Sequence, residues 1–382
     1  MVSITPTTIS TDLPDFDVTP APLRTMALII PGHNEALVIQ DTISSAIAAG
    51  QPIDDIYMVD DNSDDGTADL ARMILRPENV LTVERSGKAG AILKAIEHFH
   101  IADQYVWLHI ADADCFFEAD YFEEFIGGLD PKKHVAATGY VKSMKTNWIS
   151  KYRAYEYSFG QEITRRLQNL LGVIPVIPGP TSCFRADILD QIDFKTSNLT
   201  EDFDITLQIH RKKLGKIAYI PSAKTLTQDP KDYGDYVKQV LRWYRGFWQG
   251  IVDRRVGFRL QRIDAYLGYQ ILEMFAYYLN ILVLLPLLVI RGGAASALAI
   301  TFIIDFGIFF MMTLFAAISH KRADVISAFP LFYILRVTNM VMYLKAFVEV
   351  VLLRRFRTHA VGWSTDNRRY KISAEAVSEA VS

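Results

Sequence analysis

Two acidic clusters follow directly after short apolar runs, a position in which carboxylates are suited to binding a divalent cation. Asp112-Ala-Asp114 comes after the run from Tyr105 to Ala111, and Asp60-Asp61 comes at the end of the run that starts at Ile56. Mg²⁺ and Mn²⁺ prefer oxygen ligands, usually one or two carboxylates plus substrate phosphates. We therefore expect Asp112 and Asp114 to hold Mg²⁺ or Mn²⁺ and the diphosphate of an activated substrate, although an Asp-x-Asp alone is more often a solvated turn.

The acidic segment Val59-Asp-Asp-Asn-Ser-Asp-Asp-Gly-Thr67 has two interpretations. Asp and Asn favour turns by bonding nearby backbone groups, and Gly66 permits a positive φ angle, so a turn explains most of the segment. A turn does not explain why two strands of one sheet both end in paired acids. Asp60 or Asp61 is therefore also a candidate to accept a hydrogen bond from a nucleobase or a ribose.

Thr200-Glu201-Asp202 precedes an apolar pattern with helical spacing and also has two interpretations. Thr and Asp are good residues for capping the start of a helix. Alternatively, Asp202 is a general base that takes the proton from an attacking hydroxyl. An unperturbed Asp is mostly ionised at neutral pH, as a base must be.

Gln239-Val-Leu-Arg242-Trp243 combines side chains that recognise phosphates and sugars. At helical spacing Gln239 neighbours both Arg242 and Trp243. Arg can bind a diphosphate in a bidentate manner, and the flat face of Trp can stack on a sugar ring. The alternative is an amphipathic helix with a core Trp.

The elements that must position these residues alternate between strand and helix. Apolar runs bounded by Pro, Gly or acids predict strands, and helical periodicity predicts the segments between them. This alternation predicts an α/β fold with a mostly parallel sheet, in which ligands bind beyond the carboxyl ends of the strands. The predicted strands are 27–31, 56–60, 80–84 and 105–111, and the predicted helices are 36–49, 67–75 and 89–99.

Residues 135–250 are less regular. Trp148 to Leu171 mixes aromatic and aliphatic residues with Lys and Arg, which fits either an amphipathic helix on a membrane surface or a core helix with a solvated face. We expect a turn at Val176–Pro180, a short strand at Ile217–Ile220 and a helix at Tyr236–Val252.

Composition narrows the class of protein. Of the 382 residues 50% are hydrophobic, with the apolar excess after about Tyr266, and the net charge of −3 gives no argument for nucleic-acid binding. The two cysteines, Cys115 and Cys183, exclude a disulfide framework and fit a reducing compartment. Residues 1–24 lack the basic and apolar regions of a signal peptide, so we expect a flexible lead-in and a cytoplasmic catalytic half.

Three apolar stretches, Ala265–Ile290, Ala294–Ser319 and Val325–Leu353, are each long enough to cross a bilayer as a helix. Three crossings would place the Arg-rich tail, residues 354–382, on the far side, against the positive-inside rule. We therefore expect two full crossings plus one irregular or interfacial segment, and Pro330 makes the third stretch a candidate for a break. Charged residues interrupt the stretches and need partners or a wet interior: Glu273, Asp305, Arg336, Lys345 and Glu349.

Six short motifs stand in an order that resembles family 2 glycosyltransferases with the GT-A fold. The resemblance covers about residues 26–250. More specifically, the sequence resembles the membrane-embedded synthases of hyaluronan, chitin oligosaccharide, cellulose and poly-N-acetylglucosamine. Each motif is weak alone, and the six in this order are specific. They are Pro31-Gly-His-Asn34-Glu35, Val59-Asp-Asp61, Gly87-Lys88-Ala-Gly-Ala91, Asp112-Ala-Asp114, Thr200-Glu-Asp202 and Gln239-x-x-Arg-Trp243.

The resemblance implies roles for the matching residues. Asp60 or Asp61 would bind uridine or its ribose near Lys88, and Asp112 and Asp114 would hold the donor diphosphate, Asp114 through the metal. Asp202, next to Glu201, would deprotonate the acceptor hydroxyl, and direct displacement would give a β-linked product from an α-linked donor. The remaining donor-side residues are Pro31, Asn34, Glu35 and Arg242, and the remaining acceptor-side residues are Gln239, Trp243, Thr200, Gly179 and Ser182.

Three further features bear on the resemblance. Trp363, Arg368 and Arg369 resemble the C-terminal tail of such synthases. Synthases of this type usually have membrane helices before the catalytic domain, whereas this sequence shows none, and Ala91-Ile92-Leu93 stands where Ala-Leu-Asn is common. With fewer helices, one protomer encloses a polymer channel less easily. Protomers then assemble around a channel, or the product stays on a lipid or leaves by another route.

The sequence as a whole predicts an inverting, metal-dependent membrane glycosyltransferase that extends a β-linked glycan from a UDP-sugar. Its partners would be the nucleotide sugar, a glycan or lipid-linked acceptor, the bilayer and possible further copies of the chain. The alternatives are a single-sugar transferase to polyprenyl phosphate or another lipid, and a scaffold with a degenerate transferase fold, against which the intact acids argue. Three apolar stretches are too few for common transporters.

The expected divisions of the chain are 1–24, 25–252 (catalytic), 253–264 (interfacial linker), 265–353 (membrane) and 354–382.

Overall fold

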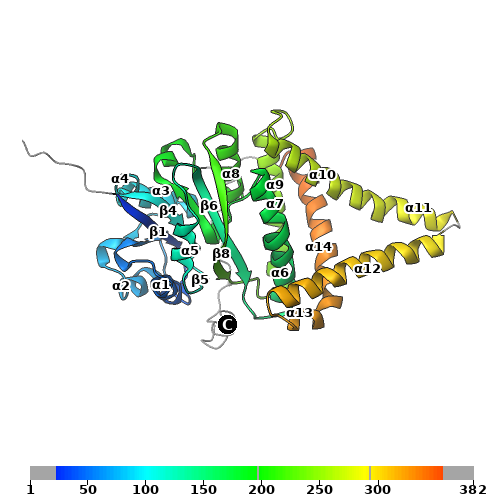
Figure 1. The fold of residues 1–382 in the computed structure, drawn as a ribbon, viewed down its shortest axis with the longest axis horizontal. Coiled ribbons are helices and arrows are strands. Elements are labelled where there is room, and N and C mark those ends of the chain that lie inside the picture. Colours follow the sequence, from blue (N-terminus) through cyan, green and yellow to red (C-terminus); the bar gives the residue numbers. More distant parts are fainter. Residues whose placement is uncertain (1–22, 196–197, 292–293, 356–382) are drawn as a thin grey trace, which may run out of the picture.

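An eight-stranded mixed sheet forms the centre of the catalytic half (Figure 1). The computed structural model describes residues 23–195, 198–291 and 294–355. The strand order is β3-β2-β1-β4-β7-β6-β8-β5, and β1 pairs in parallel with both β2 and β4. The strands are β1 Arg24–Gly32, β2 Ile56–Asp60, β3 Val80–Thr82, β4 Tyr105–Ile110, β5 Cys115–Phe117, β6 His134–Ser143, β7 Ser182–Arg185 and β8 Lys216–Thr227.

The fold confirms the prediction of an α/β domain with a mostly parallel sheet. The four predicted strands form its parallel part, β3-β2-β1-β4, and β2 has the predicted bounds. The later part contains antiparallel pairs of β7 with β4 and β6. The short strand expected at Ile217–Ile220 is the beginning of the much longer β8.

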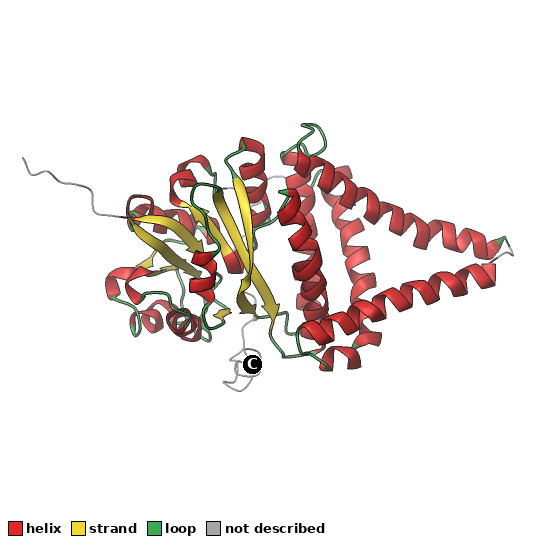
Figure 2. Ribbon diagram, viewed as in Figure 1, coloured by secondary structure: helices red, strands yellow, loops and turns green. Residues whose placement is uncertain are grey.

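Helices cover both faces of the sheet (Figure 2). Buried side chains of α1, α2 and α5 pack on one face, and those of α3 and α8 pack on the other. The helices of this domain are α1 Ile39–Ala48, α2 Thr67–Arg72, α3 Gly87–His98, α4 Ile101–Gln104, α5 Tyr121–Gly127, α6 Trp148–Phe159, α7 Arg166–Leu171, α8 Glu201–Lys212 and α9 Tyr233–Asp253.

The packing of the segment Trp148–Leu171 agrees with the interpretation as a core helix with a solvated face, and its position on a membrane surface stays a prediction. The helix α6 is a core helix, because Ile149, Tyr152 and Tyr155 are buried among aromatic residues of the later helices. A π-helical turn, Gly160–Arg165, connects it to α7, whose Leu167 and Leu170 are exposed. The α7 helix ends where Gly172 adopts a left-handed conformation (φ 67°).

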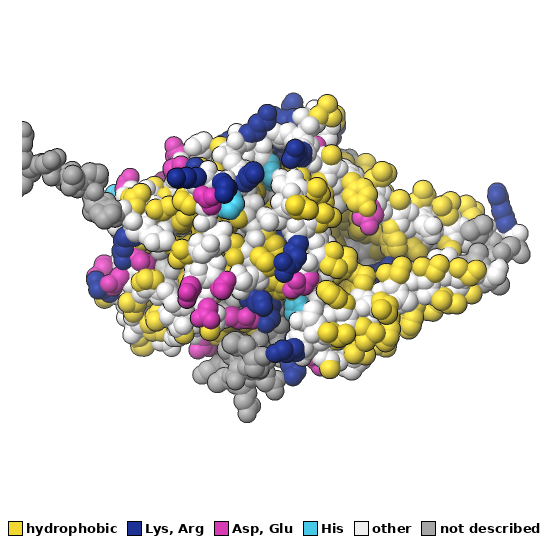
Figure 3. Space-filling model, viewed as in Figure 1, with side chains coloured by type: hydrophobic (Ala, Val, Ile, Leu, Met, Phe, Trp, Pro, Cys, Tyr) yellow, Lys and Arg dark blue, Asp and Glu magenta, His cyan; other side chains and the backbone are white. Residues whose placement is uncertain are grey.

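The C-terminal region consists of long apolar helices. Figures 1 and 3 show α10–α11 and α12 as two arms that converge away from the sheet and are covered with hydrophobic side chains. The α10 helix begins at Arg262, so the linker after α9 is shorter than the predicted 253–264. The helices are α10 Arg262–Leu279, α11 Leu285–Ile290, α12 Ala294–Ser319, α13 Asp324–Ser327 and α14 Phe329–Phe347.

Among the residues that the structure describes, three helices are long and apolar enough to cross a membrane: Arg262–Leu287, Leu298–Ser319 and Phe329–Leu352. The third predicted stretch is broken at Ala328, and Pro330 lies in the first turn of α14, where proline fits a helix. Asp305 of α12 and Arg336 of α14 satisfy each other through two hydrogen bonds of 2.8 and 2.7 Å. Residues 1–22 and 356–382, with Trp363, Arg368 and Arg369, lie outside the described part.

Candidate active site

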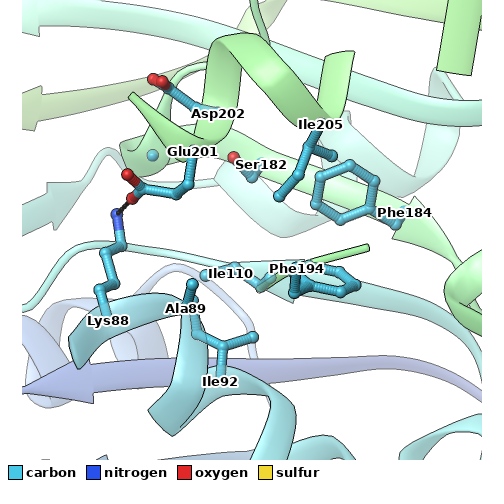
Figure 4. Close-up of a pocket in the computed structure, with 11 residues that line it drawn as sticks. Lys88, Ala89, Ile92, Ile110, Ser182, Phe184, Phe194, Glu201, Asp202 and Ile205 are labelled. Atoms are coloured by element: carbon cyan, nitrogen blue, oxygen red, sulfur yellow. Dashed lines mark ion pairs between the residues drawn. The ribbon is translucent and has the colours of Figure 1, made fainter. Parts of the chain in front are cut away.

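Lys88 joins two acidic motifs that lie far apart in the sequence. Its ammonium nitrogen lies 2.5 Å from Oδ1 of Asp112, after β4, and 3.3 Å from Oε1 of Glu201, at the start of α8. Figure 4 shows Lys88 reaching toward Glu201, with Asp202 beside it. Burial alone would lower the pKa of Lys88, but the two carboxylates outweigh burial and raise that pKa. The site therefore holds a permanent positive charge between two acids.

Gly179 packs directly on this ion pair. A Cβ atom at this position would lie 2.8 Å from Nζ of Lys88 and 2.8 Å from Oδ2 of Asp112. The loop before β7 therefore reaches the pair only because this residue has no side chain. Ser182 lines the same pocket, and its hydroxyl donates to the carbonyl of Pro178 at 3.0 Å, which fixes the loop. The structure thus brings Gly179 and Ser182, predicted for the acceptor, against the predicted donor-side charges.

Asp202 lies in the first turn of α8. Its Oδ1 accepts a hydrogen bond from the backbone N–H of Phe203 at 2.8 Å. Burial, together with the negative charge of Glu201, raises the pKa of Asp202 to about 6, although Lys88 and Arg242 oppose the rise. Asp202 is therefore ionised at neutral pH and more basic than an ordinary Asp, which suits a general base.

Thr200 takes the N-cap position of α8 without capping the helix. Its hydroxyl makes no hydrogen bond to the first turn and donates instead to Oδ1 of Asn198 at 3.2 Å. The capping interpretation is thus right for the position of Thr200 and wrong for its hydroxyl. The side chain instead packs against α9, where a Cβ atom at Gly246 would overlap it.

Two glycines of α9 allow α8 to approach closely. Beside the overlap at Gly246, a Cβ atom at Gly250 would lie 2.6 Å from Cε1 of Phe203. Arg242 lies one turn before Gly246, and its Nη1 donates to the carbonyl of Leu199 at 3.2 Å. The close packing therefore sets the position of the Glu201–Asp202 turn relative to Arg242.

The three residues of α9 that the sequence singled out, Gln239, Arg242 and Trp243, contact two different parts of the structure. Arg242 faces α8, whereas Gln239 and Trp243 both contact Arg153 of α6. Sequence reasoning missed Arg153. Its Glu156 partner three residues later was a weak signal, since helical pairs at this spacing are common.

Asp60 and Asp61 are both buried and hydrogen-bonded, Asp60 within the acidic turn and Asp61 to the start of α3. Asp60 accepts hydrogen bonds from the backbone and the hydroxyl of Ser63. Asp61 accepts from the backbone N–H groups of Ser86 at 2.7 Å and Gly87 at 2.9 Å, at the start of the helix that carries Lys88. The bonds of Asp60 support the turn interpretation, those of Asp61 join the turn to α3, and contact of either acid with a nucleotide stays a prediction.

Pro31 lies near the end of β1, and Asn34 and Glu35 belong to the loop after it, which supports the acidic turn. Pro31 pairs with Val59 across the parallel strands. Asn34, with a φ of 56°, accepts the backbone N–H of Asp64 at 3.1 Å, and the backbone N–H of Glu35 donates to Thr67 at 2.8 Å. The three residues therefore lie at the carboxyl end of β1, and their donor-binding roles stay predictions.

The predicted metal ligands Asp112 and Asp114 differ in their surroundings. Asp112 is engaged by Lys88, whereas Asp114 is buried, 4% exposed, near Tyr157. In the described ranges no group of three or more His, Cys, Asp or Glu side chains is placed to hold a metal ion. Both side chains carry the oxygen ligands that Mg²⁺ and Mn²⁺ prefer, and the phosphate oxygens of a donor would supply further ligands.

Asp229, after β8, is a further buried acid that the sequence did not reveal. Burial raises its pKa to about 7, against the opposing effects of its hydrogen bond from Ser143 and of Arg153. Burial and the negative charges of Asp229 and Asp114 raise the pKa of Tyr157.

Comparison with known proteins agrees with this geometry. The poly-beta-1,6-N-acetyl-D-glucosamine synthase of Staphylococcus epidermidis is 23% identical over 371 residues, 90% of this chain and 87% of that protein. The enzyme of the same name from Staphylococcus aureus (strain COL) is 27% identical over 240 residues, 61% of this chain and 56% of that one.

A solved structure and a family model extend the comparison. A mannosyltransferase from Pyrobaculum calidifontis, in complex with GDP-Man and Mn²⁺, has a TM-score of 0.56 at 16% identity and covers 85% of this chain and 88% of its own, a likeness of fold. The model of glycosyltransferase like family 2 matches residues 22–246. The sheet and this match agree: the chain belongs to family 2 of the glycosyltransferases and has the GT-A fold.

Proposed function

We propose that this glycosyltransferase is inverting and metal-dependent, and that it transfers sugar from a UDP-sugar to a growing β-linked glycan. The observation that carries the proposal is the convergence of Lys88, Asp112, Glu201 and Asp202 at the carboxyl end of the sheet. The names of the staphylococcal relatives support a polymer of N-acetylglucosamine as the first product to test.

Asp202 is the proposed general base. In a single displacement, the acceptor hydroxyl attacks the anomeric carbon, its proton passes to Asp202, and the bond to the donor diphosphate breaks with its electrons on the phosphate. The raised pKa of about 6 supports this role, because a more basic carboxylate holds the proton better.

Lys88 and Arg242 are the proposed cations for the leaving diphosphate. Lys88 stays protonated between its carboxylate partners, and Arg242 is held by its bond to the carbonyl of Leu199, before the start of α8. Fixed positive charges aimed at a developing negative charge lower the barrier without reorganising.

The carboxylates of Asp114 and Asp112 are the proposed ligands of Mg²⁺ or Mn²⁺. Bound there, the ion would neutralise the diphosphate as it leaves. The protein holds the strand end at which both acids stand, because the backbone N–H of Ala111 donates to Ile29 of β1 at 3.1 Å.

A donor screen followed by product sizing tests this function. Full-length protein in lipid nanodiscs is given UDP-N-acetylglucosamine, UDP-glucose or GDP-mannose with Mn²⁺, and released nucleotide is measured. We expect UDP release from a UDP-sugar and a ladder of β-linked products. GDP release alone would contradict the proposed donor, and one added sugar on a lipid would favour the single-sugar alternative.

We further propose that only α10–α11 and α12 cross the bilayer, and that α14 lies along its surface. The second half of α14 and the π-helical turn after it lie beside α9, with contacts from Tyr233 to Thr338 (2.7 Å) and from Arg245 to Glu349 (2.8 Å) (Figure 1). Since α9 carries the residues proposed to meet the acceptor, a helix bonded along it lies at the level of the catalytic domain. Arg354 and Arg355 then return to the cytoplasmic side, as the positive-inside rule favours.

Thiol labelling from one side of sealed vesicles tests this topology. Native Cys115 and Cys183 are buried, so single cysteines can be added at exposed positions. We expect Arg355→Cys to be labelled from the same side as Lys132→Cys on the catalytic domain, and Arg291→Cys, between the two arms, from the other side. Labelling of Arg355→Cys together with Arg291→Cys would indicate three crossings.

A further inference from the structure

Arg153 is a buried cation at the centre of the proposed acceptor side. The residue is 4% exposed, and its Nη2 donates to Oε1 of Gln239 at 2.8 Å. Its guanidinium carbon lies 4.6 Å from the ring centroid of Trp243 and 4.8 Å from that of Tyr236. One side chain therefore contacts both residues that are predicted to meet the acceptor sugar.

We propose that Arg153 is the positioning residue that fixes Gln239 and Trp243 for the acceptor. This inference rests on the proposed function and assigns a residue to its acceptor side. An Arg side chain only donates, so the carbonyl oxygen of Gln239 must face it, and the amide nitrogen is the group left to donate to a sugar hydroxyl. The cation covers one face of the Trp243 indole, so a sugar ring must stack on the other face.

The orientation of Arg153 is set by Glu156, one turn later on α6. Nη1 of Arg153 donates to Oε2 of Glu156 at 2.6 Å. The planar guanidinium thus bonds an acid at one nitrogen and an amide at the other while stacking on aromatic rings, a combination that the point charge of Lys does not reproduce.

Glu156 in turn connects Arg153 to the C-terminal region. Its Oε1 accepts a hydrogen bond from Nδ2 of Asn339 on α14 at 3.1 Å, and Oδ1 of Asn339 accepts from the hydroxyl of Tyr236 at 2.7 Å. Tyr236 also stacks on Arg153. The acceptor-side geometry therefore depends on α14 being seated against α6 and α9.

The test measures how many sugars enter glycan for each UDP released, using UDP-N-acetylglucosamine, Mn²⁺ and full-length protein in nanodiscs. This ratio does not depend on the fraction of folded enzyme, so a merely structural role would leave it unchanged. In Arg153→Lys we expect the ratio to fall about tenfold, because a small misplacement of the acceptor slows transfer more than hydrolysis. The matched control is Arg166→Lys, whose side chain is 53% exposed and pairs with Glu162, and it should keep the wild-type ratio.

A second variant separates the contribution of α14. Asn339→Leu removes the contact with Glu156 and leaves the Arg153–Glu156 pair, and we expect a ratio about threefold below wild type. An unchanged ratio in Arg153→Lys would overturn the positioning role, and an unchanged ratio in Asn339→Leu would overturn the dependence on α14. Failure of the wild type to release UDP from any UDP-sugar would instead contradict the proposed function itself.

Discussion

The proposed donor side and the proposed acceptor side of the candidate site are built in different ways. On the donor side, Asp61 and Asp112 follow parallel strands. Lys88 lies on α3, and the backbone N–H groups at the start of this helix donate to Asp61. On the acceptor side, Gln239 and Trp243 depend on Arg153 of another helix, which depends on contacts with α14. Strand register therefore fixes the first set, whereas packing between the catalytic and C-terminal regions fixes the second.

This difference predicts two kinds of functional defect. Changes on the donor side should weaken nucleotide or metal binding, or stop the chemical step. Changes on the acceptor side should leave donor use in place and reduce the transfer of sugar to glycan.

Replacing Asp114 should give the largest donor-side defect. Asp114→Asn keeps the size of the buried side chain and removes its charge, so metal-bound diphosphate loses several kcal/mol of stabilisation, about a thousandfold in rate. Transfer assays and calorimetric titration of Mn²⁺ in the presence of UDP measure the two effects. The exposed Asp190→Asn is the control. Wild-type Mn²⁺ affinity in Asp114→Asn would remove this residue from the metal site.

A change at Gly246 should disturb the contact between α8 and α9. In Gly246→Ala the new methyl group overlaps Thr200 and displaces the Asp202 turn, so kcat should fall about ten- to a hundredfold. Gly268→Ala in α10 is the matched control, because its Cβ meets no atom within 4 Å and Ala favours a helix by about 0.5–1 kcal/mol. Equal activity of both variants would show that the close helix contact does not position the base.

The pH dependence of transfer should show the smallest effect. The pKa of Asp202 is raised to about 6, and a base must be ionised, so kcat should be constant above pH 7 and fall as the pH falls through 6. At pH 5 about one tenth of the activity should remain if one carboxylate controls the rate. A profile that is flat down to pH 5 would mean that a different group takes the proton.

The donor side was largely predictable from the sequence, because strand ends and turns are local features. Apolar runs located the four parallel strands. The resemblance put Lys88 near Asp60 and Asp61, and it did not show the ion pairs of Lys88 with Asp112 and Glu201. Even there, the sequence did not show that Gly179 approaches Lys88 closely or that Asp61 holds the start of α3, since both contacts join distant segments.

The acceptor side was predictable only in part. Helical spacing grouped Gln239, Arg242 and Trp243, but it did not reveal that Arg242 turns to α8 while the other two face Arg153. An aromatic, apolar segment such as Trp148–Leu171 fits a core and a membrane surface equally well, and only tertiary packing shows that α6 takes the core. Which long apolar helix lies beside α9 likewise depends on contacts that no periodicity encodes.

The central claim is that distant loops converge on one donor, with Asp202 as the base. The variant Asp202→Asn in full-length protein tests this claim most directly. Transfer should fall about a thousandfold because the proton acceptor is lost. Calorimetry should give a donor affinity within about threefold of wild type, because this interaction belongs to the transition state. Normal transfer by Asp202→Asn would contradict the account.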